Sequence, residues 1–181
     1  MYHIKKDRRA EISAEMICDA MLKLLEAAAF SEITVSDIQR VSTVSRSTFY
    51  RNFDCLEDVL ALLCDKGFAA AIERQKETGE SLREAVFRYW FANSRVLEVL
   101  VQINRTDILM DSFQRCSSML EKLRNRFGSD NTFDYFSGIV SSVMISIMTT
   151  WVRHGKTESE EEAMKCVKTS FSKLIYLGFI R

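Results

Sequence analysis

The amino-acid sequence predicts an all-α fold, in which an N-terminal head of three helices precedes a larger helical body. The 181 residues include no proline and only six glycines, whereas residues of high helix propensity are abundant. Apolar residues recur at intervals of three and four positions along most of the chain, which is the period of an amphipathic helix. A chain of this length with 47% hydrophobic residues can build two coupled helical units.

The first predicted helix begins at about Ile12 and ends at Phe30, with an apolar pattern that runs to Ala28. Its apolar residues are spaced so that they form one stripe, which a helix of this kind buries against its neighbours. This stripe consists of Ile12, Met16, Ile17, Ala20, Met21, Leu24 and Ala28.

Two short helices are predicted next, at about residues 35–42 and 46–53. Thr34 is the expected N-cap of the first, and Asp37, three residues later, completes a capping box. Ser45 is the expected N-cap of the second. Because only a tight turn separates these two helices, the pattern is that of a helix-turn-helix.

A long fourth helix is predicted to join the head to the body. Asp54 and Glu57 form another capping signal at its start, and the polar segment 76–80, which contains a glycine, ends it. The predicted units are therefore a head at residues 1–54, a connecting helix at 55–79 and a body at 80–181.

The body contains four further stretches with helical periodicity. Breaks are expected at residues 128–130 and 154–156, and His154 is expected to cap a helix end. Ser159 with Glu162 gives a start signal for the last helix. The four stretches are residues 82–103, 106–127, 131–153 and 159–177.

The charge balance lacks the usual sign of a nucleic-acid binder. The chain carries 25 basic and 25 acidic residues. Residues 1–53 hold eight basic and seven acidic side chains, a net charge of +1. Any interaction of the head with an anionic partner must therefore depend on where the charges lie rather than on their sum.

The sequence predicts a cytoplasmic protein without a membrane partner. No signal segment and no run of about 18 uninterrupted apolar residues is found. The cysteines are odd in number and form no CxxC pair, so they are interpreted as reduced core thiols, with a redox sensor at Cys55 or Cys64 as the less favoured alternative. The five cysteines are Cys18, Cys55, Cys64, Cys116 and Cys166.

An enzyme is not predicted. The chain has only two histidines, His3 and His154, and contains no HExxH, P-loop, GxSxG or GxGxxG motif. Metal-ligand spacing is also absent. We therefore predict no catalytic residues, no cofactor and no metal site.

Residues 30–38 (FSEITVSDI) and 44–53 (VSRSTFYRNF) resemble the DNA-binding head of the TetR/AcrR family of transcriptional regulators. The resemblance covers about residues 10–70, with Ile38 and Val44 at core positions and Phe53 closing the recognition helix. It implies a DNA-binding transcriptional regulator, a repressor released by a small-molecule effector, that binds a palindromic operator in double-stranded DNA as a homodimer.

The outward side chains of the third helix suit the major groove. The resemblance implies that Arg46, Ser47 and Thr48 face base edges, with Arg46 as the main specificity residue, while others contact phosphates. Lys5, Lys6, Arg8 and Arg9 form a basic arm that either contacts DNA or frays in solvent. The predicted DNA-binding residues are Thr34, Ser45, Arg46, Ser47, Thr48, Tyr50, Arg51 and Asn52.

Three positions depart from the family pattern. Thr43 stands where a glycine is usual, so the turn either avoids positive φ or stores strain. Asn52 replaces a histidine, and Cys55 and Leu56 stand where the family commonly has a lysine that contacts phosphate. These departures predict weaker DNA binding, and they motivate an alternative function as an adaptor or coactivator that acts through a protein partner.

The resemblance further implies an apolar effector cavity in the aromatic body and a dimer built by the last two helices. Small residues at helical spacing would let a partner helix approach closely. A ligand that favours wrongly spaced heads would lower DNA affinity. The predicted cavity residues are Phe87, Trp90, Phe91, Met110, Phe113 and Phe136. The predicted dimer residues are Gly138, Ser142, Ile145, Thr149, Phe171 and Leu174, within a small-residue stripe that also contains Ser141 and Ser146.

Overall fold

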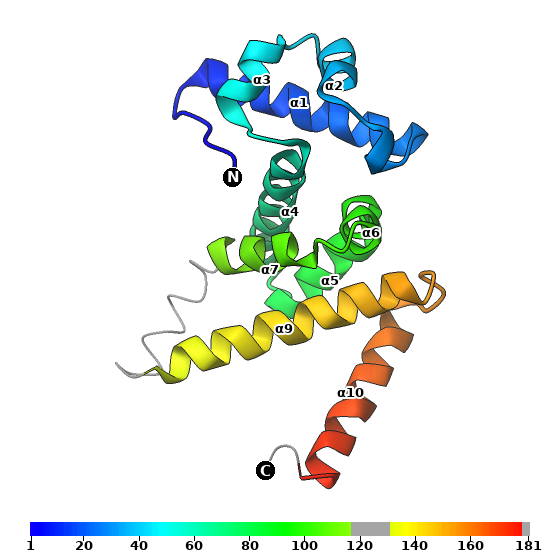
Figure 1. The fold of residues 1–181 in the computed structure, drawn as a ribbon. Coiled ribbons are helices and arrows are strands. Elements are labelled where there is room, and N and C mark those ends of the chain that lie inside the picture. Colours follow the sequence, from blue (N-terminus) through cyan, green and yellow to red (C-terminus); the bar gives the residue numbers. More distant parts are fainter. Residues whose placement is uncertain (117–130, 179–181) are drawn as a thin grey trace.

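The computed structural model describes residues 1–116 and 131–178 and confirms the all-α prediction (Figure 1). The described residues form nine α-helices and one short 3-10 helix, without strands. In chain order these are α1 (Arg8–Ala27), η1 (Phe30–Glu32), α2 (Val35–Ser42), α3 (Arg46–Asn52), α4 (Leu56–Thr78), α5 (Leu82–Ala92), α6 (Arg95–Gln102), α7 (Thr106–Arg115), α9 (Thr132–Arg153) and α10 (Glu160–Tyr176).

Helices α1, α2 and α3 form the head, and α4 runs from the head into the body (Figure 1). Helix α2 has the predicted bounds, and α3 starts at the predicted residue. The predicted apolar stripe of α1 is only partly buried, because Ile12 and Met16 are exposed. Ile17 and Met21 are buried in one core with the large side chains of α2 and α3. Burial of these large side chains is the main force that holds the short helices, which are unstable alone.

The predicted cap of α4 is wrong. The helix starts at Leu56 after Cys55, which makes no side-chain cap hydrogen bond. Instead the backbone N–H of Asp54 donates to Oδ2 of Asp58 at 2.9 Å. The carboxylate one turn into the helix therefore holds the chain that precedes the helix, because its side chain reaches back toward the N-terminal end.

The stretch predicted as one helix from residue 82 to 103 is two helices, α5 and α6. Asn93 follows α5 with φ −123° and ψ 50°, and its Nδ2 donates to the carbonyl of Tyr89 at 2.9 Å. A side chain that competes for backbone hydrogen bonds in this way favours a helix end. Helix α7 starts at the predicted residue 106 and is described to Arg115, whereas the rest of that predicted stretch falls largely on residues 117–130, outside the described residues.

The core of the body is aromatic. The ring of Phe68 on α4 lies 5.2 Å from the ring centroids of both Trp90 on α5 and Phe113 on α7. Helix α9 closes this core with Met144 and Met148. Helix α10 leaves α9 at a turn and points away from the body (Figure 1), and Ala163 is its only buried residue.

Helix α9 ends at Arg153 with His154 at the cap, as predicted. By length and composition alone α9 could cross a membrane, since its best 18-residue window has a mean hydropathy of 1.4, a value that core helices also reach. A third of that window is buried. In this fold α9 is a core helix with one exposed side.

Two of the five cysteines do not fit the prediction of core thiols. Cys55 and Cys166 are exposed, Cys116 is half-buried, and Cys18 and Cys64 are buried. Burial raises the pKa of the Cys18 thiol to about 12 and also raises the pKa of the Cys64 thiol. These two buried thiols remain protonated near neutral pH and are unreactive.

Candidate nucleic-acid interface

The start of α2 is fixed by a capping box between Thr34 and Asp37. The N–H of Asp37 donates to Oγ1 of Thr34 at 3.2 Å, and the N–H of Thr34 donates to Oδ2 of Asp37 at 3.0 Å. The Thr34 hydroxyl and the Arg40 guanidinium also donate to this carboxylate, and these bonds lower the pKa of Asp37 to about 2. The predicted cap is confirmed, and it places Thr34 at the exposed N-terminal end of α2.

The turn between α2 and α3 contains a threonine in the left-handed region. Thr43 has φ 62° and ψ 4°, and its N–H donates to the carbonyl of Gln39 at 2.9 Å. Next to it, Oγ of the buried Ser42 accepts from the N–H of Val44 at 3.1 Å. Because a β-branched residue is unfavourable at positive φ, the strained alternative of the two predicted for this turn is the one observed.

Thr43→Gly is expected to raise the free energy of unfolding by about 0.5 to 1 kcal/mol. Glycine removes the left-handed penalty of about 1 to 2 kcal/mol, and its greater freedom in the unfolded chain offsets part of the gain. The measurement is the urea midpoint at unchanged slope. Thr169→Gly, in the exposed middle of α10, is the control and is expected to lose a few tenths of a kcal/mol. A lower midpoint for Thr43→Gly would contradict the strained turn.

Ser45 caps the recognition helix α3. Its Oγ accepts from the N–H of Thr48 at 3.2 Å and lies 3.0 Å from Oγ of Ser47 and 2.9 Å from Oγ1 of Thr48. These hydroxyls form a small hydrogen-bonded group at the N-terminal end of α3. Arg46, Ser47 and Arg51 are exposed, so the outer side of the helix is polar.

The side chain of Arg46 is held in place by an aromatic ring. Its guanidinium carbon lies 5.6 Å from the ring centroid of Tyr50, one turn later on α3. The ring of Tyr50 in turn contacts Phe49 edge-on at 5.3 Å, and Phe49 is in the core. A cation over an aromatic face is attracted to it, so the exposed guanidinium is connected to the core through the rings of Tyr50 and Phe49.

One predicted DNA contact is wrong in this structure. Asn52 is 1% exposed, and its Nδ2 donates to the carbonyl of Thr48 at 2.9 Å. The side chain at the last position of α3 therefore points into the head and satisfies the end of its own helix. It is not presented on the outer face with Arg46 and Tyr50.

Residues on both sides of Lys5 and Lys6 in the basic arm make hydrogen bonds to the head. Asp7 caps α1 by accepting from the N–H groups of Arg9 and Ala10, and Lys5, Lys6 and Arg8 are exposed around it. The residues before the arm dock on the head through the backbone N–H of His3, a contact that no local pattern predicts.

The predicted cavity residues lie in or beside the aromatic core. Phe87, Trp90 and Phe113 are buried, and Phe91 packs on Trp151 at 4.1 Å between ring centroids. The indole Nε1 of Trp90 is buried without a hydrogen-bond partner in the described part of the chain. Met110 and Phe136 are half-buried. The structure thus brings these six side chains to the body core.

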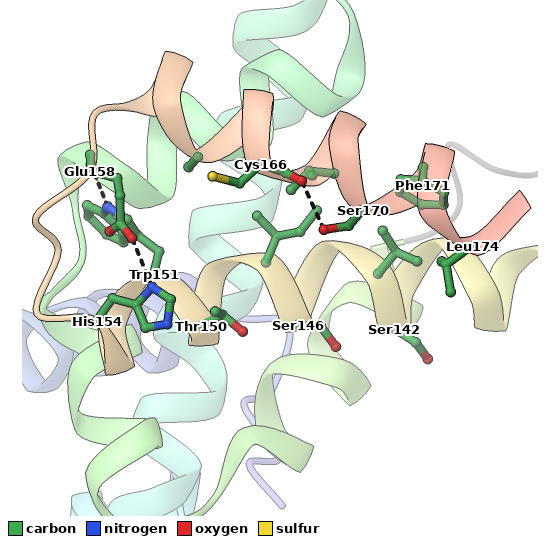
Figure 2. Close-up of a pocket in the computed structure, with 14 residues that line it drawn as sticks. Ser142, Ser146, Thr150, Trp151, His154, Glu158, Cys166, Ser170, Phe171 and Leu174 are labelled. Atoms are coloured by element: carbon green, nitrogen blue, oxygen red, sulfur yellow. Dashed lines mark hydrogen bonds and ion pairs between the residues drawn. The ribbon is translucent and has the colours of Figure 1, made fainter. Parts of the chain in front are cut away.

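A groove of about 510 Å³ lies between α9 and α10 (Figure 2). At its closed end Trp151 donates from Nε1 to the carbonyl of Glu158 at 2.9 Å, and His154 Nδ1 lies 2.8 Å from Oε1 of Glu158. Phe171 and Leu174 lie toward the other end (Figure 2). Exposed side chains of α9 line the remaining side.

The predicted dimer stripe on α9 is partly wrong. Ile145 and Thr149 are buried, as is Ser141, and Thr149 Oγ1 donates to the carbonyl of Ile145 at 2.9 Å. These residues face the body, because they lie on the inner side of the helix. The exposed side consists of Tyr135, Ile139, Ser142, Ser146 and Thr150, with Gly138 half-buried beside them.

The described residues thus place a helix-turn-helix head on an all-helical body, the architecture of a class of DNA-binding regulators. The chain is 31% identical over 65 residues to the HTH-type dhaKLM operon transcriptional activator DhaS of Lactococcus lactis subsp. lactis (strain IL1403). The aligned part is 36% of this chain and 35% of that relative, so the match spans about a third of the length of the relative.

A solved structure of a dihydroxyacetone kinase operon activator, DhaS, shows the same fold. It superposes with a TM-score of 0.59 over 92% of this chain and 98% of that chain, at 18% sequence identity. No family model matches the chain, so membership of the TetR/AcrR family stays a prediction. These likenesses support an all-helical fold shared with a transcriptional regulator.

Proposed function

We propose that this protein is a cytoplasmic, DNA-binding regulator of transcription that reads a two-fold-symmetric DNA site as a homodimer. The observation that carries this proposal is the outer face of α3, a short helix capped by Ser45 and seated on a buried core. That face presents Arg46, held on Tyr50, to solvent. A rigid helix that exposes an oriented arginine suits recognition in the major groove.

The residues predicted to contact DNA, apart from Asn52, are assigned roles in the proposed complex. Arg46, Ser47 and Thr48 face base edges, while Tyr50 and Arg51 lie nearer the phosphates. Thr34, at the N-terminal end of α2, provides a contact where the free N–H groups and the helix dipole favour an anion. Ser45 contributes by fixing the start of α3 rather than by a contact of its own.

The proposed direction of regulation is activation. The sequence predicted a repressor released by a small-molecule effector, but the relative and the solved structure that resemble this chain are both named as operon activators. An effector that binds among the aromatic residues of the body remains part of the proposal. Its site is proposed around Nε1 of Trp90, which is buried and has no hydrogen-bond partner among the described residues, since a buried donor without a partner is costly.

A helical adaptor that acts through a protein partner is the second candidate. Two observations favour it: Asn52 is withdrawn from the outer face, and the first turn of α4 carries Glu57 and Asp58 instead of a basic residue. Each missing phosphate contact lowers affinity and reduces the dependence of binding on salt. The two candidates therefore differ in whether the purified protein binds DNA alone.

The test is a titration of the full chain onto the duplex upstream of its own coding sequence and onto an unrelated duplex, at two salt concentrations. The regulator predicts preferential binding to the first duplex that weakens as salt rises. Absence of any binding at low salt would contradict the regulator and support the adaptor.

Arg46→Ala is expected to reduce the preference for the specific duplex by roughly 5- to 150-fold, which corresponds to about 1 to 3 kcal/mol for one arginine fork on guanine. Arg153→Ala, at the exposed end of α9, is the matched control and should keep the wild-type preference. Fluorescence anisotropy with both duplexes measures the ratio. Equal losses in the two variants would contradict the assigned role of Arg46.

A further inference from the structure

The segment before α1 folds back onto the head and the connecting helix (Figure 1). The backbone N–H of His3 donates to the carbonyl of Asn52, at the end of α3, at 2.9 Å. The hydroxyl of Tyr2 donates to Oδ2 of Asp65 on α4. The side chains of Tyr2 and Ile4 are half-buried against the apolar core. A few residues thus connect the end of the recognition helix to the middle of α4.

Asp65 is the point where the head, the connecting helix and the body meet. Besides the hydroxyl of Tyr2, its carboxylate accepts from the hydroxyl of Ser112 and, at 2.9 and 3.1 Å, from Nη2 and Nε of Arg115. Ser112 and Arg115 belong to α7, and the side chain of Asp65 is 14% exposed. A largely shielded carboxylate with this many donors holds each of them firmly, because charge-assisted hydrogen bonds are the stronger ones.

A second bridge holds the opposite end of α1. Arg95 on α6 donates from Nε to the carbonyl of Leu25 at 2.8 Å. Within the described residues, these hydrogen bonds join the head side of the molecule to α6 through Arg95 and to α7 through Asp65. A change in the angle between head and body requires at least one of these attachments to open.

We propose that residues 2–4 are a strap that fixes the orientation of the head against the body, with Asp65 as its anchor. The strap has one side-chain hydrogen bond to its anchor and lies between exposed residues, so it opens before the packed helices do. When Tyr2 is docked, the strap joins the end of α3, through the N–H of His3, to the Asp65 carboxylate, to which α7 also donates. When Tyr2 is released, the head turns about α4.

The strap also gives a physical route from the body to the head, and this step rests on the proposed function. Met110 and Phe113, two of the residues proposed to meet an effector, lie on the same helix as Ser112 and Arg115. A displacement of α7 would move two of the donors that fix the anchor carboxylate. Docking of Tyr2 and the position of α7 are then coupled equilibria.

The first test uses NMR to measure the rate of amide hydrogen exchange at His3 in the full chain without DNA. Tyr2→Phe keeps the ring and removes the hydroxyl that donates to Asp65. Exchange at His3 is expected to become roughly tenfold faster or more, the range for loss of one hydrogen bond to a charged group. Tyr176→Phe, at a position that is 89% exposed, makes the same chemical change elsewhere and should leave this rate unchanged. An unchanged rate in Tyr2→Phe overturns the strap.

The second test asks whether the strap orients the head. In the wild type, residual dipolar couplings of α1–α3 and of α5–α7 are expected to fit one alignment tensor. In Tyr2→Phe, the magnitude of the alignment tensor fitted to the head should become smaller than the magnitude fitted to the body. Tyr176→Phe should behave as the wild type does. If exchange at His3 becomes faster and both parts still share one tensor, the segment is docked without holding the head, and the proposal is overturned. Neither readout involves DNA, so the proposed function can fail independently.

Discussion

Gly67→Val is expected to lower the free energy of unfolding by about 3 kcal/mol. Gly67 lies inside α4 against α5, and a Cβ at this position would lie 2.9 Å from both Cζ2 of Trp90 and Cε1 of Tyr89. Trp90 is 1% exposed and packed on Phe68, so its ring cannot move aside without disturbing the core. Overpacking of this kind costs about 1 to 3 kcal/mol, and the branched side chain adds two more carbons at the same contact. The better helix propensity of valine returns only a few tenths of a kcal/mol.

The measurement is urea unfolding followed by far-ultraviolet circular dichroism, with the slope compared between variants. Ala70→Val provides the control, because Ala70 is exposed on the same helix and the substitution changes only helix propensity, by about 0.5 kcal/mol. A loss in Gly67→Val no larger than the loss in Ala70→Val would show that α4 and α5 do not approach at this glycine.

The position of Gly67 inside a helical stretch is itself a sequence signal for this close approach. An isolated glycine in a helical stretch costs about 1 kcal/mol relative to alanine, so its presence suggests a packing reason. Which side chain provides that reason is a property of the tertiary structure, since Trp90 is 23 positions away on another helix. Local pattern can flag such a position but cannot identify the partner.

The head was more predictable than the body because its helices are marked by local chemistry. The caps Thr34 and Ser45 lie within three residues of the groups they satisfy, and both are confirmed. The strain at Thr43 was one of two alternatives that the sequence left open. Asn52 was misplaced because the direction of a side chain at the last position of a helix depends on the packing beneath it.

Long-range contacts explain the remaining differences. The pair of Tyr2 and Asp65 is separated by 63 positions, and no periodicity in the sequence connects them. On α9, small residues occur on both sides of the helix, so composition alone did not separate the inner residues Ile145 and Thr149 from the outer ones. The side of a helix that meets a partner is decided by which side its own fold leaves exposed.

Ile139→Asp is expected to dissociate the proposed homodimer, with a dissociation constant at least a hundredfold above that of the wild type. Ile139 is 63% exposed on α9, next to Tyr135 at 73%, and Gly138 beside them leaves room for a second helix. Exposed apolar side chains that gather on two neighbouring helices mark an association surface. Under two-fold symmetry the substitution introduces two carboxylates, and burying an unpaired charge is strongly unfavourable.

Sedimentation of the wild type and of Ile139→Asp at micromolar concentration shows whether each is a dimer or a monomer. Ile12→Asp, on the exposed side of α1 in the head, introduces the same charge away from the proposed interface and should remain dimeric. A wild-type monomer, or an Ile139→Asp variant that sediments as the wild type does, would contradict an interface on this side of α9. Since one small head makes too few base contacts for a selective site, the monomeric variant is also expected to lose preferential DNA binding although Arg46 and Tyr50 are intact. That loss would connect the exposed side of α9 to the recognition helix through symmetry alone, without any contact between them.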